Sequence, residues 1–189
     1  MELFLSISVG LGLAAACGFR IFIPLLLVGA AHHSGHLELA DSFLWVASTP
    51  AMIGFGVATF LEIGAYYIPF LDNLLDTLAG PSAVVAGTIV TASQVASMDP
   101  WLTWTVAIIG GGGAAGIVQG ATTFARSVSS VATAGFGNPI VSTLEAGASV
   151  VMTFLAVMAP LVAVVCIALV AGWLVKRFFF APDEPAVAA

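Results

Sequence analysis

The chain has 189 residues, of which 60% are hydrophobic and 7% are charged, and its formal net charge is -6. A soluble domain is about 45–50% apolar and about 25% charged, so this composition excludes an ordinary soluble protein. With 4 Lys and Arg residues in all, the chain has no basic patch that could hold nucleic acid. The composition therefore predicts a polytopic membrane protein.

The long, continuously apolar runs favour helices over the strands of a barrel. Strands of a membrane barrel alternate over about ten residues, whereas a spanning helix needs about 20 apolar residues. We predict an all-α membrane protein with about six transmembrane helices in two inverted three-helix repeats, with broken or re-entrant segments allowed. The repeats would cover residues 1–97 and 98–180 of a single domain, and residues 181–189 are predicted to be a disordered tail.

The first apolar stretch, from residue 3 to about residue 31, is longer than one span needs. We expect a break at Gly18 or Pro24, because proline removes a backbone donor. Arg20 lies between these two positions. Two interpretations stay open: its guanidinium reaches a membrane interface, or it lies in the interior and pairs with Glu62, Glu145 or an anionic substrate.

The connection that follows contains all 3 histidines, His32, His33 and His36. Neutral imidazole binds zinc, copper or nickel, so one interpretation is a transition-metal site. A solvated loop is the other, because the spacing matches no strong metal motif.

The second helix is expected from residue 50 to about residue 69, with Glu62 beyond its middle. Thr59 lies one turn before Glu62 on the same face, so we expect it to donate a hydrogen bond to the carboxylate.

Polar residues follow at once, at Asp72, Asn73 and Asp76. Acids near the start of a helix are typical, since they interact favourably with the positive end of its dipole. The alternative is that these side chains line a vestibule and contact a solute.

The dipeptide Gly80-Pro81 is expected to open a third helix, and a fourth should extend from about Leu102 to Phe124. The fourth contains consecutive glycines at 110–113, each of which costs about 1 kcal/mol in a helix interior. The glycines therefore indicate either close backbone packing or a broken helix whose ends face a ligand.

Residues 126–139 are rich in small and hydroxyl side chains, which predicts a plain or a re-entrant loop. The apolar chain from 140 to 180 is long enough for two spans. Pro160 is the expected divider, with one kinked helix as the alternative.

Segments 57–65 and 141–148 resemble each other. Each contains a glutamate that follows Leu, precedes Gly and Ala at the second and third positions, and has a hydroxyl residue three positions before it. A carboxylate at bilayer depth costs about 2.5–3.5 kcal/mol or more, so its repetition indicates a shared purpose. We predict that Glu62 and Glu145 approach each other near the middle of the bilayer.

Three segments carry a resemblance to a known family: CGFRIFIP at 17–24, YYIPFLDNLLDT at 66–77 and GNPIVSTLE at 137–145. Through them the whole chain resembles bacterial inner-membrane proteins of domain-of-unknown-function family 4126. The resemblance implies a multi-pass membrane protein and no particular activity.

We therefore expect a small transporter or permease of the bacterial inner membrane, coupled to a proton or cation through the paired glutamates. The few positive charges favour a cation or a neutral molecule as substrate. With six spans, the positive-inside rule places Arg126, Lys176, Arg177 and both termini in the cytoplasm. The candidate substrate- or ion-binding residues are Glu62, Glu145, Arg20, Thr59, Ser142, Asn73, Asp76, Gln119 and Asn138.

The main alternative is a structural or assembly subunit whose glutamates pair with another chain. An intramembrane enzyme is less favoured, because the sequence has no HExxH, GxSxG or serine-histidine pairing. The expected partners are the lipid bilayer and a small ion or solute; a homo-oligomer stays open, and no cofactor is predicted.

Overall fold

The computed structural model describes residues 1–65 and 67–179, which form helices and no strand. This confirms the predicted all-helical class. The elements in chain order are α1 (Glu2–Phe19), α2 (Phe22–His33), the 3-10 helix η1 (Asp41–Ala47), α3 (Thr49–Ala65), α4 (Pro69–Val95), α5 (Pro100–Thr105), the π-helix η2 (Val106–Gly112), α6 (Gly113–Thr133), α7 (Asn138–Met158) and α8 (Pro160–Phe179).

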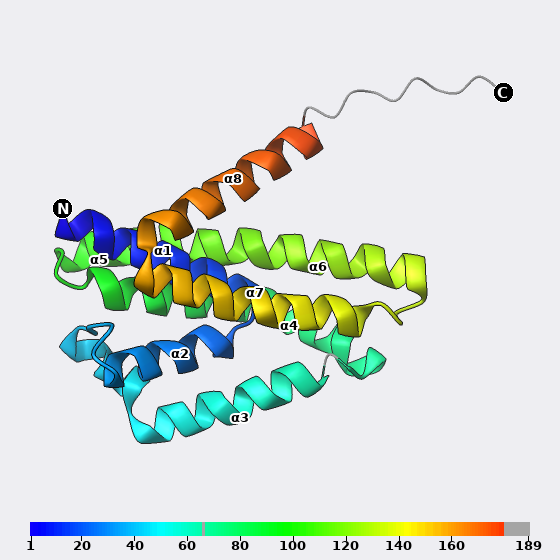
Figure 1. Cartoon of the computed structure of the whole chain (residues 1–189), viewed down its shortest axis with the longest axis horizontal. Coiled ribbons are helices and arrows are strands. Elements are labelled where there is room, and N and C mark those ends of the chain that lie inside the picture. The colour runs from blue at the N-terminus through cyan, green and yellow to red at the C-terminus, as the bar shows by residue number, and fades with distance from the viewer. Residues whose placement is uncertain (66, 180–189) are drawn as a thin grey trace.

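Helix α1 is the centre of the bundle and contacts α4, α6, α7 and α8 (Figure 1). Its residues 13–18 are buried and mostly small. A Cβ added at Gly12 would lie 2.7 Å from the Ala156 Cβ, and one at Gly18 would lie 2.6 Å from the Ala115 carbonyl oxygen. Small residues on α1 thus allow several helices to pack around it at close range.

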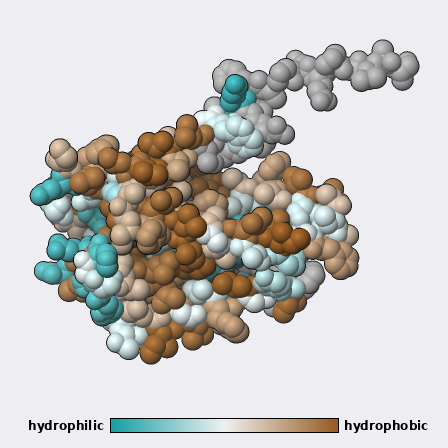
Figure 2. All heavy atoms as spheres, in the orientation of Figure 1, coloured by the Kyte–Doolittle hydropathy of each residue, from teal (hydrophilic) through white to brown (hydrophobic). Residues whose placement is uncertain are grey.

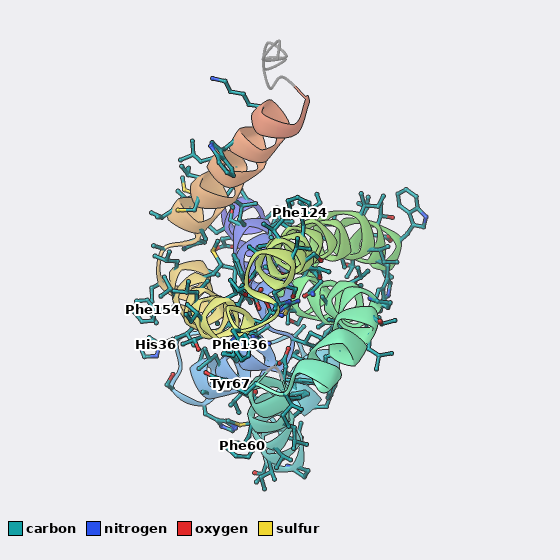
Figure 3. The ribbon with its side chains drawn as sticks, turned by 90° about the vertical axis from the view of Figure 1, so that its right-hand side faces the viewer. His36, Phe60, Tyr67, Phe124, Phe136 and Phe154 are labelled. Atoms are coloured by element: carbon teal, nitrogen blue, oxygen red, sulfur yellow. The ribbon has the colours of Figure 1, made fainter. Side chains whose placement is uncertain are left out.

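The outer helices turn large apolar side chains outward and small or polar ones inward. Phe60 of α3, Phe124 of α6 and Phe154 of α7 project away from the helices and are 54–77% exposed (Figure 3). Figure 2 shows apolar side chains over the middle of the molecule and hydrophilic ones at the end near the N-terminus. This distribution suits lipid outside and polar helix contacts inside. The buried residues of α7 are Asn138, Ser142, Glu145, Ser149, Thr153 and Ala156.

Four stretches of the described residues are long and apolar enough to cross a membrane: α1, residues Thr77–Val95 of α4, the continuous helix Pro100–Thr133, and α7. Counting η1 and α3, which are bent by 52°, as one span gives a fifth. The helix α2 and the apolar segment Pro160–Leu169 of α8 are shorter. The structure therefore supports a multi-pass membrane protein, and the predicted six spans and inverted repeats are not confirmed.

Two predicted breaks are confirmed. The first apolar stretch divides between Gly18 and Pro24, because α1 ends at Phe19 and α2 begins at Phe22. The last divides before Pro160, where α8 begins and leaves the bundle (Figure 1). The predicted tail at 181–189 lies outside the described residues.

Two predicted boundaries are wrong. Pro81 does not open the third helix but lies inside α4, which begins at Pro69. The predicted loop at 126–139 is helical up to Thr133, and the chain turns at Ala134 and Gly135, whose φ values are 52° and 88°. Helix α6 is therefore longer than expected and carries Arg126 within the bundle.

The glycines at 110–113 lie in an unbroken helix with a π-helical turn. A Cβ at Gly111 would lie 2.1 Å from the Thr91 Oγ1 and 2.7 Å from the Gly87 carbonyl oxygen. A Cβ at Gly113 would meet open space. Close packing of η2 on α4 therefore explains part of the glycine run, and a break in the helix is not needed.

Candidate functional site

Arg20 lies at the break between α1 and α2 and is only 1% exposed. Its Nη2 is 3.2 Å from the Glu145 Oε2. The same nitrogen donates to the Ser142 carbonyl oxygen at 2.9 Å and to the Ser142 hydroxyl. Arg20 therefore lies in the interior and joins the end of α1 to α7, as one of the two sequence-based interpretations proposed.

A second arginine reaches the same acid from α6. Arg126 is 1% exposed, and its Nη1 donates to the Glu145 Oε2 at 2.5 Å. The sequence predicted that a loop begins at Arg126, whereas the structure places this residue inside α6 with its side chain buried in the bundle. The available signal was periodicity, since the buried residues of α6 recur every three or four positions. They are Ala115, Gln119, Thr122 and Arg126.

Glu62 holds the start of α2 from α3. Its Oε1 accepts a hydrogen bond from the Ile21 backbone N–H at 3.0 Å, and its Oε2 accepts one from Phe22 at 3.3 Å. The first N–H groups of a helix have no partner within the helix, and a negative charge there is favourable. The charges of Arg20 and Arg126 also act on Glu62. Glu62 is 8% exposed, so most of the residue is enclosed by protein.

The two glutamates therefore hold adjacent residues of one connection. Glu145 binds Arg20, and Glu62 binds the next residue, Ile21. The predicted convergence is thus indirect, through the α1–α2 connection. We call Arg20, Glu62, Arg126 and Glu145 the charge cluster; its two positive and two negative groups balance.

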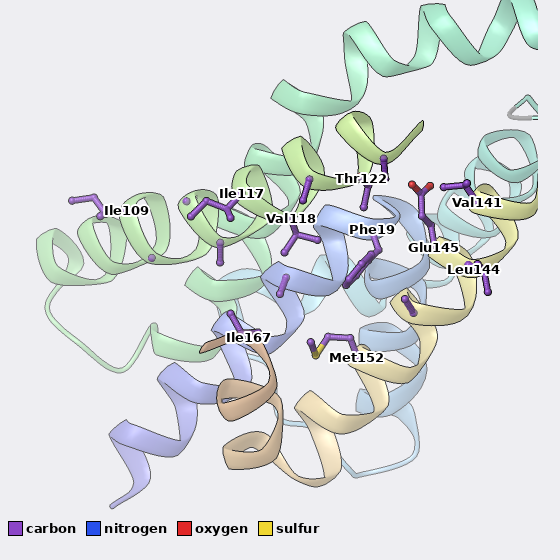
Figure 4. Close-up of a pocket in the computed structure, with 17 residues that line it drawn as sticks. Phe19, Ile109, Ile117, Val118, Thr122, Val141, Leu144, Glu145, Met152 and Ile167 are labelled. Atoms are coloured by element: carbon purple, nitrogen blue, oxygen red, sulfur yellow. The ribbon is translucent and has the colours of Figure 1, made fainter. Parts of the chain in front are cut away.

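Each glutamate lines a separate groove. Glu145 lies with Thr122 at one end of a groove of about 550 Å³ that extends to Ile109 (Figure 4). Glu62 lines another, of about 350 Å³, next to α2, α3 and α4. The two linings share no residue, yet equivalent positions of the repeated motif contribute to both. These pairs are Ala58 and Val141, Leu61 and Leu144, Glu62 and Glu145, and Ala65 and Ala148.

The hydroxyls of the two motifs differ. Ser142 contacts Arg20, as described above. The Thr59 Oγ1 is buried and has no hydrogen-bond partner among the residues that the structure describes. The predicted bond from Thr59 to Glu62 is therefore not formed, because the carboxylate is turned toward the start of α2.

The remaining candidate residues either bond to partners outside the charge cluster or have side chains that the structure does not describe. Gln119 is buried and donates to the Thr123 Oγ1 at 3.2 Å, and Asn138 donates from Nδ2 to the Ser130 Oγ at 2.8 Å. Their binding roles stay predictions. Asn73 and Asp76 belong to α4, and their side chains lie outside the described part of the structure.

The rings of the three histidines form local hydrogen bonds within the connection that contains them. His32 and His33 bond to the carbonyl oxygens of Leu37 and Ala47, whereas His36 bonds to the Ser34 hydroxyl. Within residues 1–65 and 67–179, no three His, Cys, Asp or Glu side chains are placed to hold a metal ion. Local hydrogen bonds in the connection account for these rings, as the solvated-loop interpretation expects, and a metal-binding role stays a prediction.

The sequence was compared with protein families, curated proteins and solved structures. The model of a family described as "Domain of unknown function (DUF4126)" matches residues 7–179. No curated protein and no solved structure matches the chain. Because the family match covers nearly the whole sequence, the chain belongs to domain-of-unknown-function family 4126.

Proposed function

We propose that the protein is a small secondary transporter or permease, coupled to a proton or cation through Glu62 and Glu145. The observation that carries the proposal is that these two acids, from equivalent positions of a repeated motif, hold consecutive residues of the α1–α2 connection. Ionisable groups inside a membrane bundle are costly, and they commonly mark ion or substrate pathways.

The charge balance of the cluster provides the coupling. A proton or cation bound at one glutamate neutralises its charge. The two arginines are then attracted to the other glutamate, which carries the remaining negative charge of the cluster. Because Arg20 directly precedes Ile21, a shift of Arg20 also moves the N–H that Glu62 holds. Binding in one groove is thereby transmitted to the other groove through the connection.

The proposal includes an inverted-repeat architecture in the bacterial inner membrane, with both termini in the cytoplasm. Counting the η1–α3 pair and α8 as spans, together with the four longer stretches, gives about six, or three in each half. An odd number per half inverts the second copy. In this arrangement α3 and α7 are the middle helices, and each carries one glutamate of the charge cluster.

The assembly alternative required the glutamates to pair with another chain. Glu145 pairs instead with Arg20 and Arg126 of its own chain. That pairing accounts for Glu145 within the chain and favours transport, which is the function that we carry forward, with the bilayer and a small ion or solute as partners.

The test is ion flux in liposomes that contain the purified protein. A potassium diffusion potential is imposed, and an enclosed pH dye reports proton entry, with sodium and potassium flux followed in parallel. We expect flux well above that of protein-free liposomes. The double variant Glu62→Gln with Glu145→Gln should reduce it to the protein-free level, because neither site can then bind a positive charge.

Glu38→Gln is the control, since Glu38 lies exposed on the connection before η1 and should leave flux unchanged. Flux that persists in the double variant would refute the proposal. Wild-type protein that moves no proton or metal cation would refute it as well.

A further inference from the structure

We propose that the Glu62 groove is a binding site for an amphipathic organic cation, with the positive head at Glu62 and an alkyl or aromatic body along the groove. The inference rests on the proposed transport function, for which it names the substrate class. The groove is lined by Glu62 and by mainly apolar residues, among them Phe22, Leu61, Leu75, Leu78 and Ala65.

The two glutamates differ in their direct partners. Glu145 already contacts the guanidinium groups of Arg20 and Arg126. Within the described residues, Glu62 forms no salt bridge, and its hydrogen bonds come from the backbone N–H groups of Ile21 and Phe22. A carboxylate has about four acceptor positions, so Glu62 retains capacity for a positive group. An anion placed there would meet a like charge.

The groove at Glu62 has a size and an opening that suit a small amphipathic molecule. Its volume of about 350 Å³ is within the range of small-molecule sites, which is about 300–1,000 Å³. Leu61 and Leu78 are 61% and 57% exposed, so the groove opens at the outer surface of the bundle. In a membrane that surface meets lipid, and an apolar body can enter from the bilayer.

The lining of the groove favours an organic cation over a metal ion. Hard metal cations take about six or more oxygen ligands, or keep several waters. Among the described residues of this lining, Glu62 and Ser82 are polar and the others are apolar. A quaternary ammonium needs no such ligand shell, because its charge is spread over apolar groups that pack against the walls.

Binding is measured by calorimetry on the protein in nanodiscs of zwitterionic lipid, with empty nanodiscs subtracted. The probes are hexyltrimethylammonium and hexanesulfonate, which share a chain and differ in the sign of the head group. We expect the cation to bind at least about tenfold more tightly than the anion.

Two variants locate the site. Glu62→Gln keeps an oxygen for the Ile21 N–H but removes the charge, and it should weaken cation binding at least about tenfold. Ala65→Leu should weaken it by obstructing the groove without a change of charge. The matched variant Ala148→Leu, at the equivalent position of the Glu145 groove, should leave binding within about twofold of wild type, as should Glu38→Gln.

Equal affinity for the two probes would overturn the inference, and so would cation binding that survives both Glu62→Gln and Ala65→Leu. If Glu62→Gln does not fold, two comparisons still test the inference. They are the affinities of the two probes for the wild type and the effects of Ala65→Leu and Ala148→Leu on cation binding. Ion flux that depends on the glutamates without cation binding would refute this substrate class alone. Cation binding without ion flux would refute the proposed transport function but would support the binding site.

Discussion

The two copies of the glutamate motif have similar sequences and different surroundings. The copy at 141–148 lies in α7, which contacts α1, α2, α6 and α8 and buries six residues. The copy at 57–65 lies in α3, which packs mainly on α2 and η1 and buries only Glu62. The same letters therefore yield a paired acid in the bundle core and a backbone-bonded acid at its edge.

The difference between the copies shows that the repeated motif determines the position of the carboxylate on its helix. The neighbouring helices determine which group the carboxylate binds. Glu145 has two guanidinium partners because α6 passes beside it, whereas Glu62 faces the start of α2. We therefore expect Glu145 to contribute more to stability and Glu62 to be more directly available to a ligand.

The largest predicted effect comes from neutralising each glutamate in turn. Glu145→Gln leaves two buried guanidinium groups without their carboxylate, and loss of one partner of a buried pair costs about 3–5 kcal/mol. Glu62→Gln preserves an acceptor for the Ile21 N–H, so we expect a loss of about 1 kcal/mol. The free energy of unfolding is measured in mixed micelles by circular dichroism during titration with a denaturing detergent.

Equal losses of unfolding free energy in Glu145→Gln and Glu62→Gln would contradict the proposed difference between the two copies. Adding Arg126→Gln to Glu145→Gln is the control. It removes one uncompensated charge and should recover part of the lost stability if the ion pair is responsible.

A smaller effect is expected at the two hydroxyls that precede the acids. Ser142→Ala removes a hydroxyl bonded to Arg20, and a hydrogen bond to a charged group contributes about 1.5–3 kcal/mol. Thr59→Val preserves the shape of a side chain whose oxygen has no hydrogen-bond partner within the described residues, so it should be neutral or slightly stabilising. The same unfolding titration measures both, and a larger loss for Thr59→Val would contradict the assigned geometry.

The sequence was sufficient to predict the fold class and to identify two acids whose burial is costly. Long apolar runs indicated helices, and the prolines near residues 24 and 160 marked breaks, because proline cannot continue the hydrogen-bond ladder. Pro81 misled the prediction, since α4 accommodates it within the helix. A proline shows where a donor is missing, and the neighbouring helices decide whether the chain bends there.

The partners of the acids were harder to predict. Arg20 was identified because it lies within an apolar run, whereas Arg126 is surrounded by Ser, Thr and Ala that resemble a loop. Only its regular spacing from Thr122 and Gln119 marks it as part of the buried face of α6. The contact between Glu62 of α3 and the start of α2 could not be predicted. Its donors are backbone N–H groups, which are not specific to any residue type.

The central claim is that the two glutamates act on one connection, and a double-mutant cycle between Glu62→Gln and Glu145→Gln tests it most directly. Without Glu145, Glu62 is the remaining negative charge of the cluster, so its removal should then cost more than it does in the wild type. The account predicts that the double variant loses at least about 1 kcal/mol more unfolding free energy than the sum of the single losses. Losses that add within about 0.5 kcal/mol, as independent sites do, would contradict it.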